Sequence, residues 1–210
     1  MRLYDYWHSA ASYRVRIALR LKGIAYEQVP VNLRQGAQRT LDYLAHNPQG
    51  LVPSLTDGDA TVTQSLAIIE WLDERQPEPP LLPLDLLARA TVRSLALHVA
   101  SDIQPLTNLR VLQHLQHRLG VEERELHAWQ RHWIAEGLAS LERRLASVAG
   151  VYAYGDTVTL ADLCLVPQVY KARRYHCDLV PFPVIRRVDA ACLALAAFAE
   201  ARPERQPDAA

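Results

Sequence analysis

Signals for β-strands stop after residue 63, although the chain runs to 210 residues. Runs of β-branched and aromatic residues bounded by turn residues are typical of strands. Four such runs occur, and they cover residues 2–6, 26–31, 50–55 and 60–63. From residue 85 on, the pattern is that of helices alone. The chain therefore has to combine one small sheet with a separate helical part.

Helical segments alternate with these strands. They are expected at 12–22, 37–46 and 65–76, and Gly23 follows the first of them as a typical helix-ending residue. Asp57-Gly58-Asp59 is a turn signal that joins the last two strands as a hairpin. The order β-α-β-α-β-β-α predicts a compact α/β domain over residues 1–76, with a mixed four-stranded sheet.

A cluster of prolines follows this domain. Pro77, Pro79, Pro80 and Pro83 predict a stiff linker over 77–84. An all-helical domain is expected over 85–210, with helices at 85–119, 122–148, 159–175 and 184–201. One of these helices opens on Thr159-Leu-Ala-Asp162, which we interpret as a capping box and thus a structural helix start.

Charge and hydropathy exclude several classes of partner. Lysine plus arginine and aspartate plus glutamate each total 23, so no overall field directs the chain to nucleic acid or to an anionic membrane. No apolar run approaches the roughly 20 residues of a bilayer span, and the first residues do not resemble a signal peptide. We expect a cytoplasmic protein without nucleic-acid or membrane partners.

Cysteine and histidine spacing does not predict a metal site. Cys164, Cys177 and Cys192 are odd in number and widely spaced, unlike a disulfide framework or a zinc motif. The histidines between 114 and 132 have no acid or cysteine that completes a ligand set. The N-terminal half also contains no cysteine, so any thiol chemistry there requires a thiol brought by a cofactor.

The start of the first helix offers an anion site. Ser9 and Ser12 lie at or near its positive end, where free N–H groups and a hydroxyl would lower the pKa of a bound thiol. Plain helix capping is the alternative. Arg14 falls on the apolar side of this helix, whereas Arg16 and Arg20 fall opposite. A structural ion pair and a place beside a ligand both remain open for Arg14.

Two further features could hold an extended ligand. Pro53 interrupts a strand, and a cis Val52-Pro53 bond would turn the backbone of Val52 toward a bound peptide. Gln64-Ser65 begins a helix, and Ser65 as its N-cap would leave N–H groups free for a carboxylate. Ordinary capping is again the alternative.

These motifs resemble a known family. Residues 47–55 and 64–69 resemble the thioredoxin-like domain of glutathione transferases, and the helical remainder with its Thr159-Leu-Ala-Asp162 is also similar. The resemblance is closest to the zeta class, which includes maleylacetoacetate isomerase and maleylpyruvate isomerase. The segments that carry this narrower resemblance are 14–19, 103–108, 165–169 and 205–208.

The resemblance implies a bound glutathione and a set of residues around it. Ser9 is then the hydroxyl that stabilises the thiolate, with Ser12 and Arg14 as catalytic candidates beside it. The other residues implied to contact glutathione are Gln38, Val52, Pro53, Gln64, Ser65, Gln104 and Asn108. The zeta class usually has Ser-Cys after this serine, whereas this chain has Ala10-Ala11. A mechanism that needs that second hydroxyl or thiol is therefore excluded.

The implied substrates are dicarboxylic keto acids, which need cationic partners. Arg14, Arg110 and Arg174 are the candidates, because arginine binds carboxylates through two parallel hydrogen bonds. His8 joins them at a position where the maleylpyruvate isomerases resemble one another in having arginine.

The expected function is a glutathione-dependent cis–trans isomerase, acting first on maleylacetoacetate to give fumarylacetoacetate. Alternatives are a maleylpyruvate isomerase, a general zeta-class transferase that conjugates small electrophiles, and a glutathione-binding module without catalysis. The resemblance also implies a homodimer.

Overall fold

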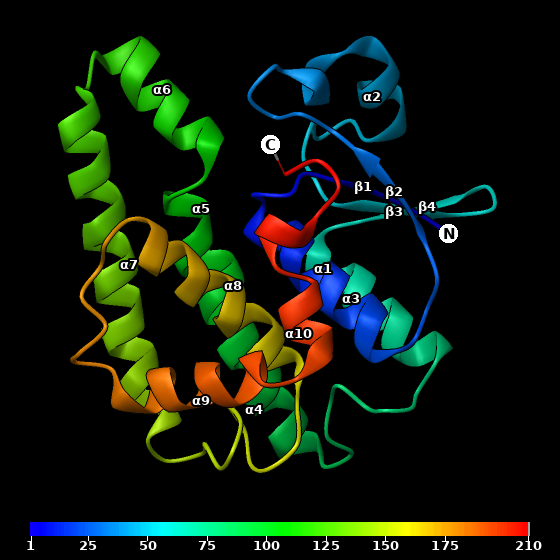
Figure 1. Ribbon diagram of the computed structural model, residues 1–210, viewed down its shortest axis with the longest axis vertical. Coiled ribbons are helices and arrows are strands. Elements are labelled where there is room, and N and C mark those ends of the chain that lie inside the picture. The colour runs from blue at the N-terminus through cyan, green and yellow to red at the C-terminus, as the bar shows by residue number, and fades with distance from the viewer. Residues whose placement is uncertain (210) are drawn as a thin grey trace. The chain divides into compact units, whose positions relative to one another are not determined.

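The computed structural model describes residues 1–209, which form two compact units (Figure 1). The first unit contains residues 1–81 together with the described residues from 194 on, and the second contains residues 82–193. The boundary lies inside the predicted linker. Its first prolines stay with the first unit because the buried Lys22 Nζ donates to the carbonyl of Pro79 (2.5 Å) and contacts Asp73 (2.6 Å).

The first unit is built on the predicted mixed sheet. Its strands are β1 (Arg2–Asp5), β2 (Glu27–Pro30), β3 (Ser54–Asp57) and β4 (Ala60–Thr63), in the order β2-β1-β3-β4. β1 pairs with β2 in parallel, and the other neighbours are antiparallel. β3 begins four residues later than predicted, because Pro53 has no N–H for a ladder and precedes the paired segment.

Helices cover both faces of this sheet. α1 (Ala10–Leu21) and α3 (Ser65–Arg75) lie side by side, and α2 (Leu41–His46) lies on the opposite face after the 3₁₀ turn η1 (Ala37–Arg39) (Figure 1). Leu3, Leu55 and Ile68 are fully or almost fully buried between the sheet and these helices. The C-terminus of α1 lies where it was predicted, with Lys22 as the C-cap and Gly23 at φ 63°.

The second unit is entirely helical in its regular structure. The predicted helix over 85–119 is divided, and Asn108 starts a new helix by accepting from the N–H of Arg110 with Oδ1 (3.2 Å). Thr159 and Asp162 form the predicted capping box. The elements are α4 (Leu86–Leu97), the π-helical η2 (His98–Ile103), α5 (Gln104–Leu106), α6 (Leu109–Leu119), α7 (Glu123–Leu145), α8 (Leu160–Arg174) and α9 (Pro183–Leu193).

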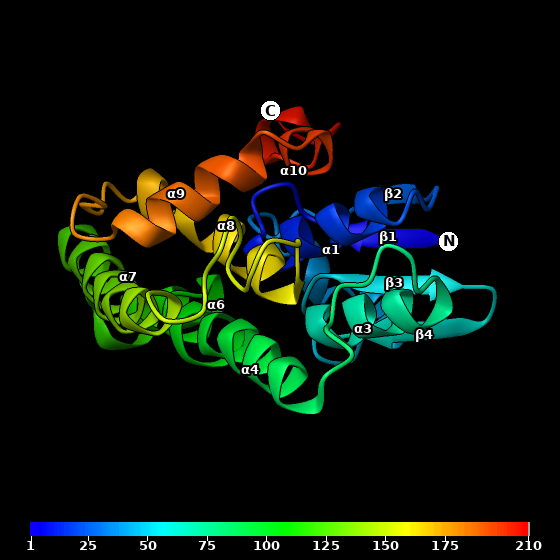
Figure 2. The same ribbon diagram turned by 90° about the horizontal axis from the view of Figure 1, so that it is seen from below.

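The C-terminal segment corrects the predicted domain boundary. Residues 194–209 do not belong to the helical unit but pack against α1 in the first unit, as α10 (Ala196–Glu200) and η3 (Pro203–Arg205) (Figure 2). The hydroxyl of Tyr13 donates to the carbonyl of Phe198 (3.2 Å). The predicted helix over 184–201 is accordingly two helices, since the chain passes from one unit to the other between them.

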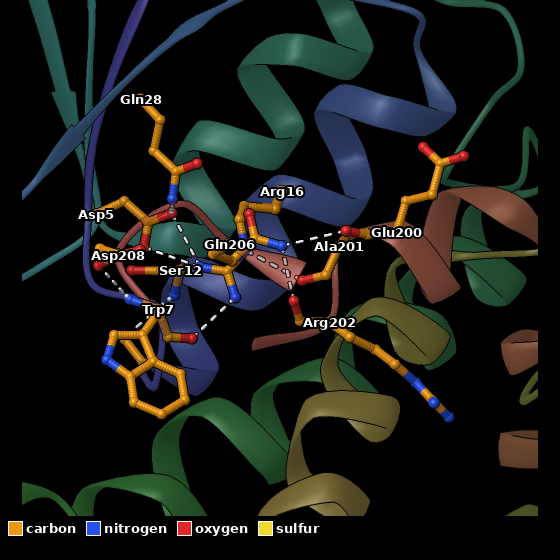
Figure 3. A network of polar contacts seen from close by, with 11 residues as sticks. Asp5, Trp7, Ser12, Arg16, Gln28, Glu200, Ala201, Arg202, Gln206 and Asp208 are labelled. Atoms are coloured by element: carbon orange, nitrogen blue, oxygen red, sulfur yellow. Dashed lines mark hydrogen bonds and ion pairs between the residues drawn. The ribbon is translucent and has the colours of Figure 1, made fainter. Parts of the chain in front are cut away.

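Arg16 corrects the expected exposed face of the first helix. Its side chain is fully buried, and Nη1 binds both carboxylate oxygens of Asp5 at 2.9 Å (Figure 3). Arg16 also donates to the carbonyls of Trp7 (3.0 Å) and Ala201 (3.1 Å). Two segments that sequence spacing could not place, the turn after β1 and the C-terminal segment, therefore cover this side of α1.

Within residues 1–209, no helix combines the length and the apolarity that crossing a membrane requires. In the same part of the chain, no three histidine, cysteine or acidic side chains are grouped so that they could hold a metal ion.

Replacement of the buried arginine tests this arrangement. Arg16→Leu leaves Asp5 as a buried charge without its guanidinium, so we expect it to reduce the free energy of unfolding by about 3 to 5 kcal/mol. Arg20→Leu, one turn further along α1, removes an ion pair with Glu200 whose side chains are 34% and 51% exposed, and should cost less than about 1 kcal/mol. Urea unfolding of both variants measures the difference, and equal losses would contradict it.

Candidate functional site

Ser9 occupies the turn between β1 and α1. Its N–H donates to the carbonyl of Tyr6 (2.8 Å), and it is the N-cap of α1, with Oγ accepting from the N–H of Ser12 (3.2 Å). Because Oγ acts as the acceptor in that bond, its own O–H hydrogen is available to a ligand. The side chain is half-buried. Ser9 thus combines the capping role with a free donor.

The first turn of α1 adds backbone donors to this hydroxyl. Ala10 and Ala11 are the first two helical residues, and their N–H groups have no acceptor within the helix. Such groups carry the partial positive charge of a helix N-terminus. The start of α1 can therefore bind an anion through Ser9 and two backbone N–H groups, without any further side chain.

Ser12 does not belong to this arrangement. Its side chain is fully buried and lies in the network around Asp5 (Figure 3). Burial raises the pKa of Asp5, while the Arg16 guanidinium and the Ser12 hydroxyl act in the opposite direction. Because Ser12 is 0% exposed, its hydroxyl is shielded from a thiol bound at the accessible start of α1, which contradicts the prediction of Ser12 as a catalytic hydroxyl.

The start of α3 forms a second candidate anion site. Gln64, not Ser65, is the N-cap residue, and it makes no side-chain cap within the described chain. Gln64 has φ 70° and ψ 116°, a conformation that is uncommon for a residue other than glycine and costs free energy. Its Nε2 donates to Oε1 of Gln49 (3.0 Å). Ser65 is the first helical residue, so the N–H groups at this end are free of intrahelical acceptors.

Arg14 lies behind this second site. It is only 1% exposed, and its Nη1 donates to Oγ of Ser65 (3.3 Å). The guanidinium therefore adds a full positive charge close to the N-terminus of α3. Its burial excludes the predicted direct clamp on a substrate carboxylate and the predicted place at the reacting thiol, so Arg14 acts on Ser65 instead.

The loop before β3 contains the predicted peptide-binding element. The Val52–Pro53 bond is cis. The side chain of Val52 packs with Tyr6 and Tyr43, and its backbone lies outside the paired residues of β3. Nearby in sequence, Gln38 is 7% exposed, and its Oε1 has no hydrogen-bond partner within the described residues.

His8 follows the same turn as Ser9. Its ring stacks on Trp7, with ring centroids 3.5 Å apart and planes 18° apart. The side chain is half-buried. The first unit thus brings together His8 and Ser9 on one turn, and Arg14 with Ser65 at another helix start.

The remaining predicted residues lie in the second unit. Gln104 begins α5, and Asn108 uses Oδ1 as the cap of α6, which leaves its Nδ2 hydrogens to donate. Arg110 is exposed on α6. Arg174 is exposed in the last turn of α8, where its guanidinium lies 5.4 Å from the ring centroid of Tyr175.

Comparison with known proteins now identifies the family. Residues 3–80 match the family model of the glutathione S-transferase N-terminal domain. The chain is 47% identical over 209 residues to a probable maleylacetoacetate isomerase of Vibrio cholerae, which covers 99% of this chain and 97% of that protein. The chain belongs to the zeta class of the glutathione transferases. The predicted family and fold class are therefore confirmed.

Among the solved structures that match the whole chain are two isomerases. One is a holo structure of maleyl pyruvate isomerase, with a TM-score of 0.98 and 48% identity over 100% of both chains. The other is a maleylacetoacetate isomerase of Methylobacterium extorquens with bound malonate and glutathione, with a TM-score of 0.97 and 44% identity over 100% of both chains.

One residue of this zeta-class transferase that no sequence motif indicated is Lys171. Its Nζ donates to the carbonyl of Thr107 (2.6 Å) and to Oγ1 of the same residue (2.8 Å). Although the residue as a whole is half-buried, burial of its ammonium group lowers the pKa of Lys171 to about 7, and Arg174 adds to this shift. The sequence offered little signal for it, since Lys171 lies in the basic last turn of α8 together with Arg173 and Arg174. Through these two hydrogen bonds, Lys171 holds Thr107, the residue before Asn108, in place.

Proposed function

We propose that this protein is a glutathione-dependent cis–trans isomerase of a maleyl keto acid, first of all maleylacetoacetate. The observation that carries the proposal is the start of α1. There, the free O–H of Ser9 and two backbone N–H groups form an anion site in a part of the chain that contains no cysteine. A thiolate bound there has to come from a cofactor, and glutathione supplies it.

Glutathione binds along the first unit in this proposal. Its γ-glutamyl carboxylate takes the N–H groups at the start of α3, where Ser65 and the buried charge of Arg14 favour an anion. The backbone of Val52 and the free acceptor of Gln38 bind the peptide part. Pro53 and Gln64 add contacts from the first unit, and the zeta-class resemblance implies two further contacts, Gln104 and Asn108, from the second. The glutathione bound to the Methylobacterium relative supports this cofactor.

The proposed reaction uses the thiolate as a temporary nucleophile. The thiolate adds to the cis double bond, and the electron pair of that bond moves into the conjugated carbonyl as an enolate. The former double bond is now a single bond and rotates. The enolate then re-forms the double bond in its trans geometry and expels the thiolate, so glutathione is recovered unchanged. Proximity of the bound thiolate and substrate accelerates the addition.

The substrate carries two acidic ends, for which His8, Arg110 and Arg174 are the proposed partners. Arg110 and Arg174 are exposed, so their guanidinium groups are available to carboxylates. The malonate bound together with glutathione in the Methylobacterium relative supports a diacid substrate. Maleylpyruvate is the second candidate, favoured by the TM-score of 0.98 with the maleyl pyruvate isomerase structure.

A paired assay tests the activity. The protein is incubated with maleylacetoacetate or with maleylpyruvate, and formation of the fumaryl product is followed by absorbance with and without glutathione. We expect conversion only with glutathione, faster on maleylacetoacetate, with glutathione recovered in full. Turnover without glutathione would contradict the mechanism.

The other outcomes of this assay separate the remaining alternatives. Faster conversion of maleylpyruvate would assign the second candidate substrate. Release of a glutathione adduct would indicate a general transferase, and glutathione affinity without turnover would indicate a binding module.

The role of Ser9 is tested on bound glutathione. Ser9→Ala removes the O–H donor and the cap, so we expect the pKa of the bound thiol to rise by about one unit or more. Ser9→Thr keeps a hydroxyl in the same place and should retain a low pKa. The ultraviolet absorbance of the thiolate against pH measures both variants. An unchanged pKa in Ser9→Ala would transfer the role to the backbone N–H groups of α1.

We also propose a homodimer in the cytoplasm. Leu84, Leu86 and Leu87 are 89%, 79% and 77% exposed within a stretch of four residues, and a second copy of this chain would cover them. Free thiols at the three cysteines fit a reducing compartment, which fractionation of the source cells tests.

Light scattering tests the dimer. The protein should have twice the mass of one chain. Leu87→Asp should shift the equilibrium toward monomer, because it places a charge in the proposed apolar contact. Leu119→Asp, at a leucine that is 64% exposed on α6, is the matched control and should leave the dimer intact. A monomeric wild-type protein would overturn the proposal.

A further inference from the structure

The turn that carries Ser9 is held through the backbone of Trp7. The carbonyl of Trp7 accepts from Nη2 of Arg16 (3.0 Å), and its N–H donates to Oδ2 of Asp208 (3.0 Å) (Figure 3). Trp7 is two residues before Ser9, and its ring stacks on His8. One of the two contacts that hold this backbone therefore comes from a residue 201 positions away, in the C-terminal segment.

Asp208 is an unfavourable choice for stability alone. Its second oxygen, Oδ1, is buried and has no hydrogen-bond partner within residues 1–209. Its charge also lies close enough to Asp5 to raise the pKa of that buried carboxyl. A buried acceptor without a partner and a second negative charge both cost free energy. The Asp208 carboxylate lowers the stability of the fold, yet it is the group that contacts the N–H of Trp7. Such a departure from the most stable arrangement is expected where a residue serves a function.

The C-terminal segment is anchored well enough to use Asp208 as a fixed point. Nε2 of Gln206 donates to the carbonyls of Glu200 (3.1 Å) and Arg202 (2.7 Å), which closes the segment on itself. The carbonyl of Ala201 accepts from Arg16, so the same arginine binds both the segment and the turn. The carboxylate of Asp208 is thus presented to Trp7 by a rigid support.

We propose that Asp208 is a positioning residue for the glutathione thiolate, acting through Trp7 on the turn that carries His8 and Ser9. This inference rests on the proposed function. An acceptor at the N–H of Trp7 fixes where the Ser9 hydroxyl and the first N–H groups of α1 point. Small displacements of such donors weaken the stabilisation of an anion steeply, because hydrogen bonds depend on distance and angle.

The experiment compares three substitutions at one position. Asp208→Ala removes the acceptor, and we expect a rise in the pKa of bound glutathione and an increase of about tenfold in KM for glutathione. Asp208→Asn keeps a side-chain carbonyl that accepts from Trp7 and removes the charge, so it should restore both quantities. Asp208→Glu displaces the acceptor by one methylene. If Asp208→Ala does not fold, Asp208→Glu is measured in its place.

A matched control separates positioning from general stability. Tyr13→Phe removes the hydrogen bond from α1 to the carbonyl of Phe198 in the same segment and keeps the backbone hydrogen bond from the N–H of Tyr13 to the carbonyl of Ser9 (2.8 Å). It should lower the thermal midpoint and leave the thiol pKa of the folded protein unchanged. Thermal unfolding is measured for every variant beside the thiolate absorbance.

The outcomes are distinct from those of the proposed function. Wild-type protein that binds no glutathione, or that leaves its thiol pKa unshifted, contradicts the proposed function itself. A wild-type protein with a lowered thiol pKa, and the same pKa in folded Asp208→Ala or Asp208→Glu, overturns the positioning role alone. A loss in Asp208→Asn equal to that in Asp208→Ala also overturns it, since the role depends on the acceptor and not on the charge.

Discussion

The buried ion pair between Arg16 and Asp5 determines how the first unit is assembled. Two charges without solvent contact are tolerated only where hydrogen bonds replace the lost water. Arg16 donates to both oxygens of Asp5 and to the carbonyls of Trp7 and Ala201, and Gln28 donates to the same carboxylate (3.0 Å). These partners come from β1, the turn after it, β2 and the C-terminal segment. The pair is satisfied only when all four segments are in place, so it couples their folding to one another.

Two arginines on α1 give the candidate site its two halves. Arg14 reaches Ser65 at the start of α3, whereas Arg16 holds the turn at the start of α1. Both helix starts expose N–H groups to one ligand class, anions. Glutathione has two groups that suit them, a carboxylate and an ionisable thiol. Both arginines belong to one helix, so α1 contributes to the placement of both anion sites.

The sequence predicted what depends on local patterns and missed what depends on distant segments. β4, the Gly23 terminus and the Thr159–Asp162 capping box follow from neighbouring residues, and the structure has them. Helical spacing placed Arg16 on the exposed side, because that spacing cannot show that the chain returns 185 residues later to cover it. The burial of Ser12 was also missed, because helical spacing does not show that this residue lies beside Asp5 of β1. Arg14 was predicted on the apolar side of its helix and is buried there, but its partner Ser65 was not predictable from α1 alone.

The alanines after Ser9 acquire a physical meaning from this geometry. Where the zeta class usually has Ser-Cys, the chain has Ala10-Ala11, which removes two polar side chains but not the backbone N–H groups at the same positions. Those N–H groups depend on the placement of the helix start. A site that relies on backbone donors needs its turn held more rigidly than a site with several adjustable side chains. The hydrogen bonds from Arg16 and to Asp208 hold the backbone of Trp7 and supply that rigidity. The anchoring of the turn therefore compensates for the absence of polar side chains after Ser9.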